Sequence, residues 1–378
     1  MNVPSDPDRE DRATFDKARQ RASIAASVRS GILSRPITSQ AAYTVPTMRK
    51  YTCRPFYKPE SEDLRFLPEG PRVLQNFGGA DSLLGWVAIQ YGAAKLRGSF
   101  NLLNLETRVN QTFELPGRPG FFAETSRSGV VVVGMERRLV LLDLKTGGVE
   151  ETGIDVTGDD RVIINDGIPI PGGLLFGTKH LEFNQKIAAL YRYDCSSKRV
   201  VELVGKQICS NGKFFLESPG SQDNTDGPMV IDIDSPPKTI SRYVFDTDFQ
   251  KVLQHSLVTP PESLPAVPDG MRPGPDGSSI VVAYYNPDPV DTGLAQEIRL
   301  SDGAVLTEWT FPGSPRVTCP EFAELDGKVC LIFTTADEGM DDATRAISPQ
   351  AGTLFYAETP FESMPEPPPL IPVESFLA

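Results

Sequence analysis

The sequence has few of the residues on which common catalytic motifs depend. It contains only two histidines, His180 and His255, and neither belongs to an H-E-x-x-H zinc motif. No G-x-S-x-G elbow is present, so a Ser-His-Asp triad is possible only in principle. Walker A and G-x-G-x-x-G loops are absent as well. We therefore expect His180 to be a hydrogen-bonded polar residue, or part of a loop that follows a strand.

Cysteine is sparse and scattered along the chain. No two of the five cysteines have the C-x-x-C spacing of a zinc knuckle or of a thioredoxin-like motif. An odd, sparse set suits reduced thiols in a cytosolic protein, so we expect a cytoplasmic location. Cys195 and Cys209 lie in or beside apolar strand-like runs, and we expect both to be core residues.

Long apolar runs and excess positive charge are also missing. No apolar run approaches the ~20 residues that a transmembrane helix needs. The N-terminus is acidic and lacks the basic and apolar regions of a signal peptide. The net charge of −13 argues against nucleic-acid partners and against binding to anionic membranes, because both require a basic surface.

Residues 1–48 differ in composition from the rest of the chain. They are rich in Arg, Ser, Ala and Asp, and they have almost no aromatic residues. A weak helical stripe runs from Phe15 to Ile32. We interpret this N-terminal extension as disordered or partly helical, with a docking helix as the alternative.

Residues 49–378 have the texture of an all-β domain. Helical periodicity over more than ten residues is nearly absent there, and the chain has 34 prolines and 32 glycines, as many tight turns require. The clearest unit begins with the polar turn Asn165-Asp166-Gly167. A Pro-Gly-Gly turn and the apolar run Leu174–Phe176 follow, which is typical of a short strand entered from a polar loop.

Related units recur about 45 to 60 residues apart. This period in an all-β sequence is typical of β-propeller blades. The other unit starts are Glu69-Gly-Pro, Gly120-Phe-Phe, Ser210-Asn-Gly, Asp269-Gly-Met and Thr318-Cys-Pro. Six units predict a six-bladed β-propeller, in which Tyr51–Tyr57 would pair with Thr353–Ala357 and close the ring. The segment Pro365–Leu370 is expected to be extended.

Several unit starts carry oxygen-bearing side chains next to glycine. Equivalent loops of all blades gather at one end of a propeller channel, so Glu69, Asn165, Asn211 and Asp269 could meet there. Glu69, Asn211 and Asp269 offer hard oxygen donors of the kind that Ca²⁺, Mg²⁺ or Mn²⁺ prefers. Taken singly, each is also an ordinary turn sequence. The metal hypothesis therefore depends on their recurrence at one place in the repeat.

In these stretches the chain resembles the senescence-marker-protein (regucalcin)/gluconolactonase/luciferin-regenerating-enzyme family of six-bladed propellers. The resemblance covers about residues 50–370. It is carried by Glu69-Gly-Pro, Asn165-Asp-Gly with Gly177-Thr178, Ala189-Leu-Tyr-Arg-Tyr, Ser210-Asn-Gly, Asp269-Gly-Met and Arg316-Val-Thr-Cys-Pro-Glu-Phe.

The resemblance implies a metal-dependent hydrolase that opens a sugar lactone or a related cyclic ester. One divalent ion, most simply Ca²⁺ with Zn²⁺, Mn²⁺ or Mg²⁺ as alternatives, would be held by Glu69, Asn211 and Asp269. Asn165 would contact the substrate, and Asp269 would act as the general base on the attacking water. The partner would be a small lactone or ester, and the protein a monomer or weak oligomer.

The sequence departs from the family pattern at several positions. Ile163 stands where members acting on sugar lactones often carry Arg, Lys179 replaces the usual Met, and Lys213 follows Asn211-Gly in place of a small apolar residue. A lid loop at residues 179–186 cannot be matched in detail. These departures leave two alternatives: a non-catalytic calcium-binding or scaffold propeller, and an organophosphate or aryl-ester hydrolase.

Overall fold

The computed structural model describes residues 47–77, 79, 82–92, 95–217 and 227–377. The expected N-terminal extension therefore lies almost entirely outside the described residues. Helices in the described part are short: α1 (Glu62–Phe66), α2 (Asp342–Ile347) and the 3₁₀ turns η1 (Pro261–Ser263) and η2 (Val373–Ser375). None of these helices is long and apolar enough to cross a membrane.

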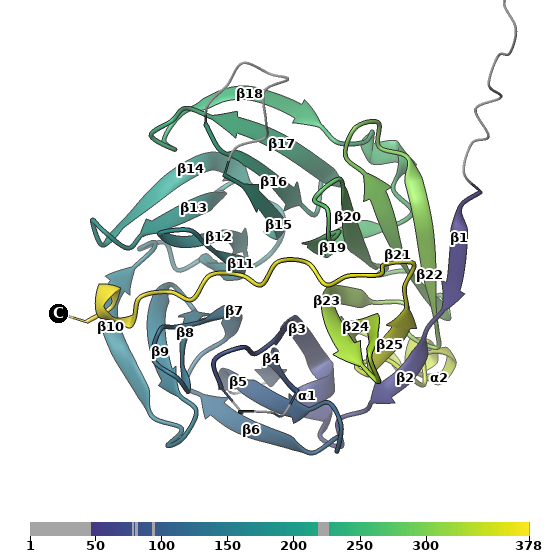
Figure 1. Ribbon diagram of the computed structural model, residues 1–378. Helices are drawn as coiled ribbons and strands as arrows, with labels where there is room; N and C mark the ends of the chain where they lie inside the picture. The colour runs from purple at the N-terminus through teal and green to yellow at the C-terminus, as the bar shows by residue number, and fades with distance from the viewer. Residues whose placement is uncertain (1–46, 78, 80–81, 93–94, 218–226, 378) are drawn as a thin grey trace, which may run out of the picture. The chain divides into compact units, whose positions relative to one another are not determined.

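Six sheets are arranged in a ring, as Figure 1 shows, and their strands pair antiparallel except for β1 with β22, so the predicted six-bladed β-propeller is confirmed. Blades 1 to 4 are four-stranded meanders whose first strand is innermost. Blade 1 contains β3 (Leu67–Val73), β4 (Leu83–Gly92), β5 (Lys95–Asn104) and β6 (Asn110–Leu115). Blade 2 contains β7 (Pro119–Glu124), β8 (Val130–Met135), β9 (Arg138–Asp143) and β10 (Val149–Asp155). Blade 3 contains β11 (Val162–Ile170), β12 (Gly173–His180), β13 (Ala188–Asp194) and β14 (Arg199–Gln207). Blade 4 contains β15 (Ser210–Leu216), β16 (Met229–Asp234), β17 (Thr239–Phe245) and β18 (Val252–Leu257).

The last two blades are completed by strands from the start of the described chain. Blade 5 contains β19 (Val267–Pro273), β20 (Ser279–Tyr285), β21 (Thr292–Arg299), β22 (Val305–Pro312) and, parallel to β22, β1 (Arg49–Thr52). Blade 6 contains β23 (Val317–Leu325), β24 (Lys328–Thr335), β25 (Leu354–Glu358) and β2 (Arg54–Tyr57). Pairing of Arg54 with Tyr356 closes the ring as expected. Tyr51 and Thr52 pair with β22 of blade 5 instead of with blade 6.

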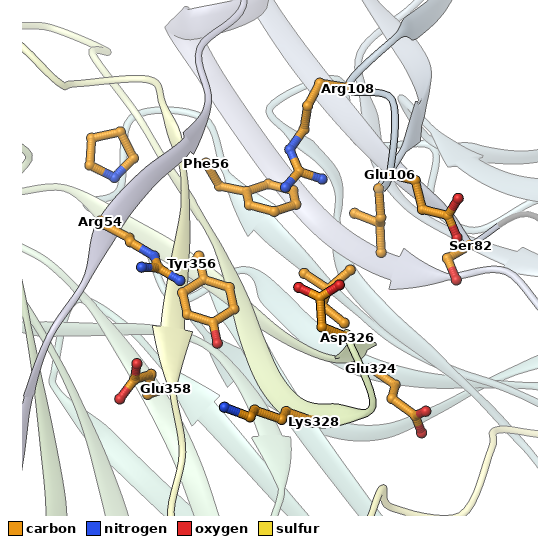
Figure 2. A pocket seen from close by; sticks show the side chains of 13 residues that line it. Arg54, Phe56, Ser82, Glu106, Arg108, Glu324, Asp326, Lys328, Tyr356 and Glu358 are labelled. Carbon is orange, nitrogen blue, oxygen red and sulfur yellow. The ribbon is translucent and has the colours of Figure 1, made fainter.

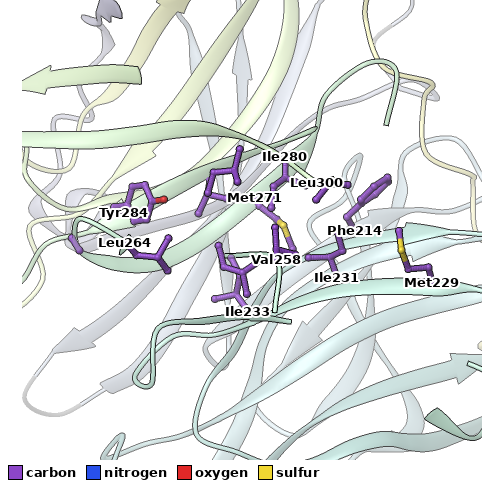
Figure 3. Packing of buried hydrophobic residues seen from close by; sticks show 14 of the residues in the cluster. Phe214, Met229, Ile231, Ile233, Val258, Leu264, Met271, Ile280, Tyr284 and Leu300 are labelled. Carbon is purple, nitrogen blue, oxygen red and sulfur yellow. The ribbon is translucent and has the colours of Figure 1, made fainter. Parts of the chain in front are cut away.

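The core consists of layers between neighbouring blades, because alternate side chains of a strand face opposite sides of its sheet. Strand β16 shows this alternation. Its Ile231 and Ile233 pack with Ile280 of blade 5, as Figure 3 shows, whereas Val230 packs with Leu175 of blade 3. The strand β16 therefore buries side chains on both faces of its sheet.

Every innermost strand has a break in its ladder near the start. The register shifts between Glu69 and Arg72 in β3, between Ile164 and Gly167 in β11, and likewise in the inner strands of the other blades. Residues at such a bulge leave the regular strand pairing, and their side chains point in a different direction from those of the regular ladder. The bulges contain the residues that the sequence singled out.

The C-terminal segment is extended, as expected, and crosses the propeller from blade 6 toward blade 2 in Figure 1. Ile371 forms a parallel bridge with Thr125, and the Tyr193 hydroxyl donates to Ser375 O at 2.6 Å. Pro365–Pro369 lines a cavity with Arg72, Arg272 and the distal ends of β11, β15 and β19. This segment therefore covers the end of the channel opposite the predicted donors.

Candidate active site at the channel mouth

The four residues singled out by the sequence line one cavity of about 510 Å³. Glu69 comes from blade 1, Asn165 from blade 3, Asn211 from blade 4 and Asp269 from blade 5. Each stands at or next to the bulge of its innermost strand. The bulges thus place oxygen-bearing side chains from four blades at one end of the channel.

Glycines next to the donors allow the inner strands to approach one another closely. A Cβ on Gly212 would lie 2.5 Å from Met271 N and 2.8 Å from Asp269 O. A Cβ on Gly270 would lie 2.1 Å from Cys319 Sγ. These three distances are shorter than real Cβ contacts, so only glycine fits at these two positions.

We expect Gly270→Ala to destabilise the protein by about 1–3 kcal/mol, because the added methyl group meets Cys319 and the backbone of blade 6. Urea unfolding would measure the change in the free energy of unfolding. Gly158→Ala is the matched control, since its Cβ would meet nothing within 4 Å. Equal unfolding midpoints for the two variants would contradict this account of the glycine.

Hydrogen bonds fix the orientation of the donor side chains. Asn211 Nδ2 donates to Asp269 Oδ1 at 2.5 Å and to Ser235 Oγ at 3.1 Å. The amide oxygen of Asn211 therefore points away from these two side chains. The Cys319 thiol donates to Glu69 Oε2 at 3.0 Å. Cys319 belongs to blade 6, so blade 6 contributes to the site by holding the Glu69 carboxylate in place.

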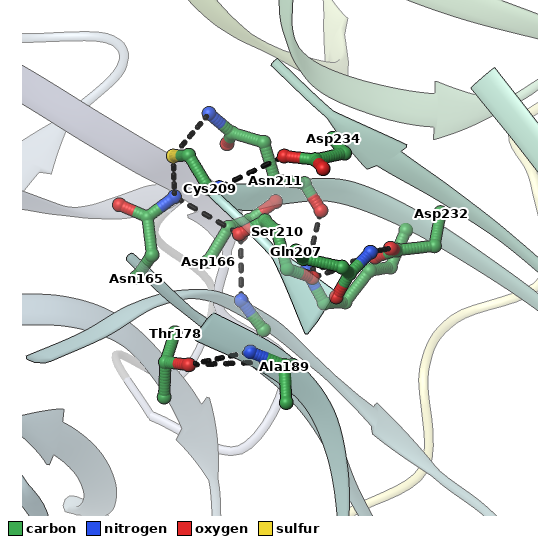
Figure 4. A network of polar contacts seen from close by, with 12 residues as sticks. Asn165, Asp166, Thr178, Ala189, Gln207, Cys209, Ser210, Asn211, Asp232 and Asp234 are labelled. Atoms are coloured by element: carbon green, nitrogen blue, oxygen red, sulfur yellow. Dashed lines mark hydrogen bonds and ion pairs between the residues drawn. The ribbon is translucent and has the colours of Figure 1, made fainter. Parts of the chain in front are cut away.

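The side chain of Asn165 is fixed by contacts of its amide nitrogen. Nδ2 donates to Ser210 O at 3.1 Å and contacts Cys209 Sγ at 3.5 Å, as Figure 4 shows. Because the nitrogen is engaged in these contacts, the amide oxygen is the group that Asn165 can offer to the cavity. Cys209 is buried, as expected, whereas Cys195 is only half-buried and packs at the edge of the core.

A buried ionic network lies behind Asn211. Lys213 Nζ donates to Asn211 O and lies 3.4 Å from Asp232 Oδ1, with both side chains fully buried. Asp232 also accepts from Gln207 Nε2 at 2.5 Å and from Ser210 Oγ at 2.8 Å (Figure 4). The network fixes the bulge that carries Asn211, so Lys213 has a structural role that its apolar surroundings in sequence did not reveal.

The cavity carries an excess of buried acid. The pKa of Glu69 is raised to about 8, chiefly by burial; the charges of Asp166 and Glu338 also raise it, whereas the Cys319 hydrogen bond and Lys179 lower it. Burial, then the charge of Glu69, raises the pKa of Asp269 well above its usual value. Lys179 is the cation among the lining residues of this cavity, and it lies buried at the end of β12.

The donor set fits a divalent cation. Carboxylates and an amide oxygen are hard donors, and a bound cation would offset the cost of keeping Glu69 and Asp269 ionised. Asp166 Oδ2 is buried without a hydrogen-bond partner among the described residues, which adds to the local acidic excess. In that part of the chain, no group of three His, Cys, Asp or Glu side chains is arranged to hold a metal. The predicted ligand set, Glu69, Asn211 and Asp269, contains only two residues of these types, because Asn211 is an amide.

Residues 67–336 match the family described as SMP-30/Gluconolactonase/LRE-like region. The chain belongs to this family. It is 25% identical over 300 residues to a putative sugar lactone lactonase, YvrE, of Bacillus subtilis, which covers 79% of this chain and 93% of the relative. It is 26% identical over 248 residues to an L-arabinolactonase of Azospirillum brasilense, which covers 65% of this chain and 76% of the relative.

A solved structure of similar fold is that of a calcium-binding protein, regucalcin, from Agrobacterium tumefaciens. The TM-score is 0.67 at 20% identity, with 85% of this chain and 98% of that chain covered. At this level of identity the likeness supports the six-bladed fold.

The cavity of this family member is also shaped by loops that follow the second strand of a blade. In an antiparallel blade the end of the second strand lies beside the start of the first. Lys179, Ser235, Tyr285 and Glu338 reach the cavity from blades 3 to 6 in this way. The Asp337-Glu338-Gly339 turn was a possible sequence signal for Glu338, but its position within the blade was not evident.

The departures from the family pattern have clear structural positions. Ile163 is buried in β11 and is absent from the cavity lining described above.

His180 is the last residue of β12 and is buried, so the expectation of a hydrogen-bonded polar residue holds and that of a loop position is wrong. Its Nδ1 accepts from the backbone N–H groups of Asn184 and Gln185 at 3.3 Å.

A larger groove of about 760 Å³ lies where blades 6 and 1 contribute residues, as Figure 2 shows. The Arg108 guanidinium stacks 3.5 Å from the centre of the Phe56 ring, and Arg54 lies 4.5 Å from that of Tyr356. Its four acidic residues are all exposed: Glu106, Glu324, Asp326 and Glu358. The groove is therefore a polar surface depression, whereas the buried acids lie in the channel mouth.

Proposed function

We propose that this protein is a metal-dependent hydrolase that opens a lactone or related cyclic ester at the channel mouth. The supporting observation is that two carboxylates and two amides from four blades line one cavity. The lactonase names of two relatives support the same reaction class.

Glu69, Asn211 and Asp269 would hold the ion, most simply Ca²⁺, with Zn²⁺, Mn²⁺ or Mg²⁺ as alternatives. When bound there, a divalent cation supplies Lewis acidity for an ester carbonyl and its developing negative charge. Asn165 offers its amide oxygen to the substrate or to the attacking water. The hydrogen bond from Asn211 Nδ2 orients the Asp269 carboxylate.

Asp269 takes one proton from the attacking water as its oxygen bonds to the carbonyl carbon. The ring C–O bond of the lactone then breaks, and the departing alkoxide oxygen receives the proton from Asp269. The product is an open-chain hydroxy acid, so one water is consumed and no oxidant is needed.

Turnover of a lactone panel, including glucono-δ-lactone, would test this proposal. The protein is first treated with EDTA and then assayed alone and after addition of Ca²⁺, Zn²⁺, Mn²⁺ or Mg²⁺. We expect activity only with added ion. Lack of metal-dependent turnover for every lactone would reject the proposal.

A non-catalytic calcium-binding propeller is the second candidate. The position of Ile163 within the core motivates it, because no guanidinium reaches the cavity from that residue. Calorimetric titration with Ca²⁺ separates the two candidates: binding without turnover of any lactone favours the second. In either case we expect a monomer or weak oligomer.

A further inference from the structure

The cavity wall above the donor residues is apolar. Its carbon-rich lining comes from strand ends and loops of four blades: Leu67, Phe183, Pro236, Val267 and Pro287. The donors Glu69 and Asp269 stand two residues further along the inner strands than Leu67 and Val267, and Lys179, Ser235, Tyr285 and Glu338 add polar groups from the ends of the second strands or just after them. A substrate group that projects from this floor toward the opening would therefore contact mainly carbon.

Several polar groups of the wall already have partners, and Lys179 Nζ lies 5.9 Å from the centre of the Phe183 ring. The Tyr285 hydroxyl lies 3.3 Å from Glu338 O and 3.4 Å from its Oε2, and Ser235 Oγ accepts from Asn211 Nδ2. Apart from the ammonium group of Lys179, this wall offers the hydroxyl groups of a sugar ring few partners in exchange for water, which is unfavourable.

Phe183 is held at the opening by a specific turn. Its side chain is 47% exposed, and its φ of +52° is in the left-handed region that non-glycine residues rarely adopt. Phe183 N donates to His180 O at 3.1 Å, and the buried His180 ring accepts from the next two backbone N–H groups. The turn therefore presents an exposed aromatic ring in the lining of the cavity, where an apolar group of a bound substrate would contact it.

We propose that the substrate is a lactone carrying an apolar substituent, an alkyl chain or an aryl group, on the carbon next to the ring oxygen. This inference rests on the proposed function. The carbonyl lies at the floor near Glu69 and Asp269, and the substituent packs against Phe183, Leu67 and Val267. Hydrolysis adds water across the ring C–O bond and gives a hydroxy acid that keeps the substituent.

A chain-length series tests the proposal: γ-butyrolactone, γ-hexalactone, γ-octalactone and γ-decalactone, compared with glucono-δ-lactone under metal-loaded conditions. We expect kcat/KM to rise about fourfold per buried methylene until the wall is covered. Glucono-δ-lactone should be at least about tenfold poorer than γ-decalactone. Metal-dependent turnover that is independent of chain length, or fastest with glucono-δ-lactone, overturns this inference and leaves the proposed function intact. No turnover of any lactone rejects both.

Phe183→Ala provides a second readout, since an exposed residue can be truncated without loss of the fold. We expect the ratio of kcat/KM for γ-decalactone to that for γ-butyrolactone to fall about tenfold. Leu253→Ala, at an exposed position on β18 that does not line the cavity, is the matched control and should keep the wild-type ratio. An unchanged ratio in Phe183→Ala contradicts the assignment of this wall to the substituent.

Discussion

Asp269→Asn should lower kcat/KM for lactone hydrolysis by about 10³-fold or more, because it removes a negative ligand and the base together. Asn has nearly the same shape, so its neighbours can remain in place. The Asn211 contact at 2.5 Å then joins two amides, which weakens a charge-assisted hydrogen bond. Steady-state kinetics with saturating metal measures the loss, and calorimetry measures the accompanying loss of cation affinity.

The matched control is Asp276→Asn, a second Asp-Gly pair that follows the same strand. Asp276 accepts from Ser278 N at 2.9 Å and Ser278 Oγ at 2.8 Å at the opposite end of β19. Asn can still accept from Ser278, so activity should remain within about twofold of wild type. Equal activities of the two variants would remove Asp269 from the proposed reaction.

The metal-free protein should lose stability as the pH rises from about 5 to 8. Burial raises the pKa of Glu69 from 4.5 to about 8, so across this window the folded state holds a proton that the unfolded chain has released. The free energy of unfolding then falls by about 1.4 kcal/mol per pH unit for this group. The contribution is fully present below the unfolded pKa and is lost as the pH passes through the folded value.

Thermal unfolding in EDTA at several pH values measures this slope. Other buried carboxyls such as Asp232 and Glu338 also have a raised pKa, so the informative quantity is the difference between wild type and Glu69→Gln. We expect the variant to have the shallower slope, and Ca²⁺ to reduce the slope of the wild type by favouring ionised Glu69. Identical slopes in EDTA would show that Glu69 ionises as it does in the unfolded chain.

The repeat and the donor residues were readable from the sequence because both are local features. Alternating apolar runs between Gly- and Pro-rich turns define strands, and their period defines blades. The residues Asn165, Asn211 and Asp269 stood out because each has an oxygen-bearing side chain and a glycine within two residues, a pattern that resembles a turn but lies at a strand bulge in the structure. The pairing of Arg54 with Tyr356 followed from the need to close the ring.

The cavity wall and the support of the donors were decided only by the tertiary structure. Phe183 and Glu338 reach the site through loops whose direction depends on strand register. Lys213 lies in an apolar strand, and its partner Asp232 was not evident because their contact depends on how β15 pairs with β16. The sequence by itself determined which oxygen donors each blade carries, since strand period and turn chemistry are local. Packing between blades decided which of them meet and what surrounds them, because those contacts join residues far apart along the chain.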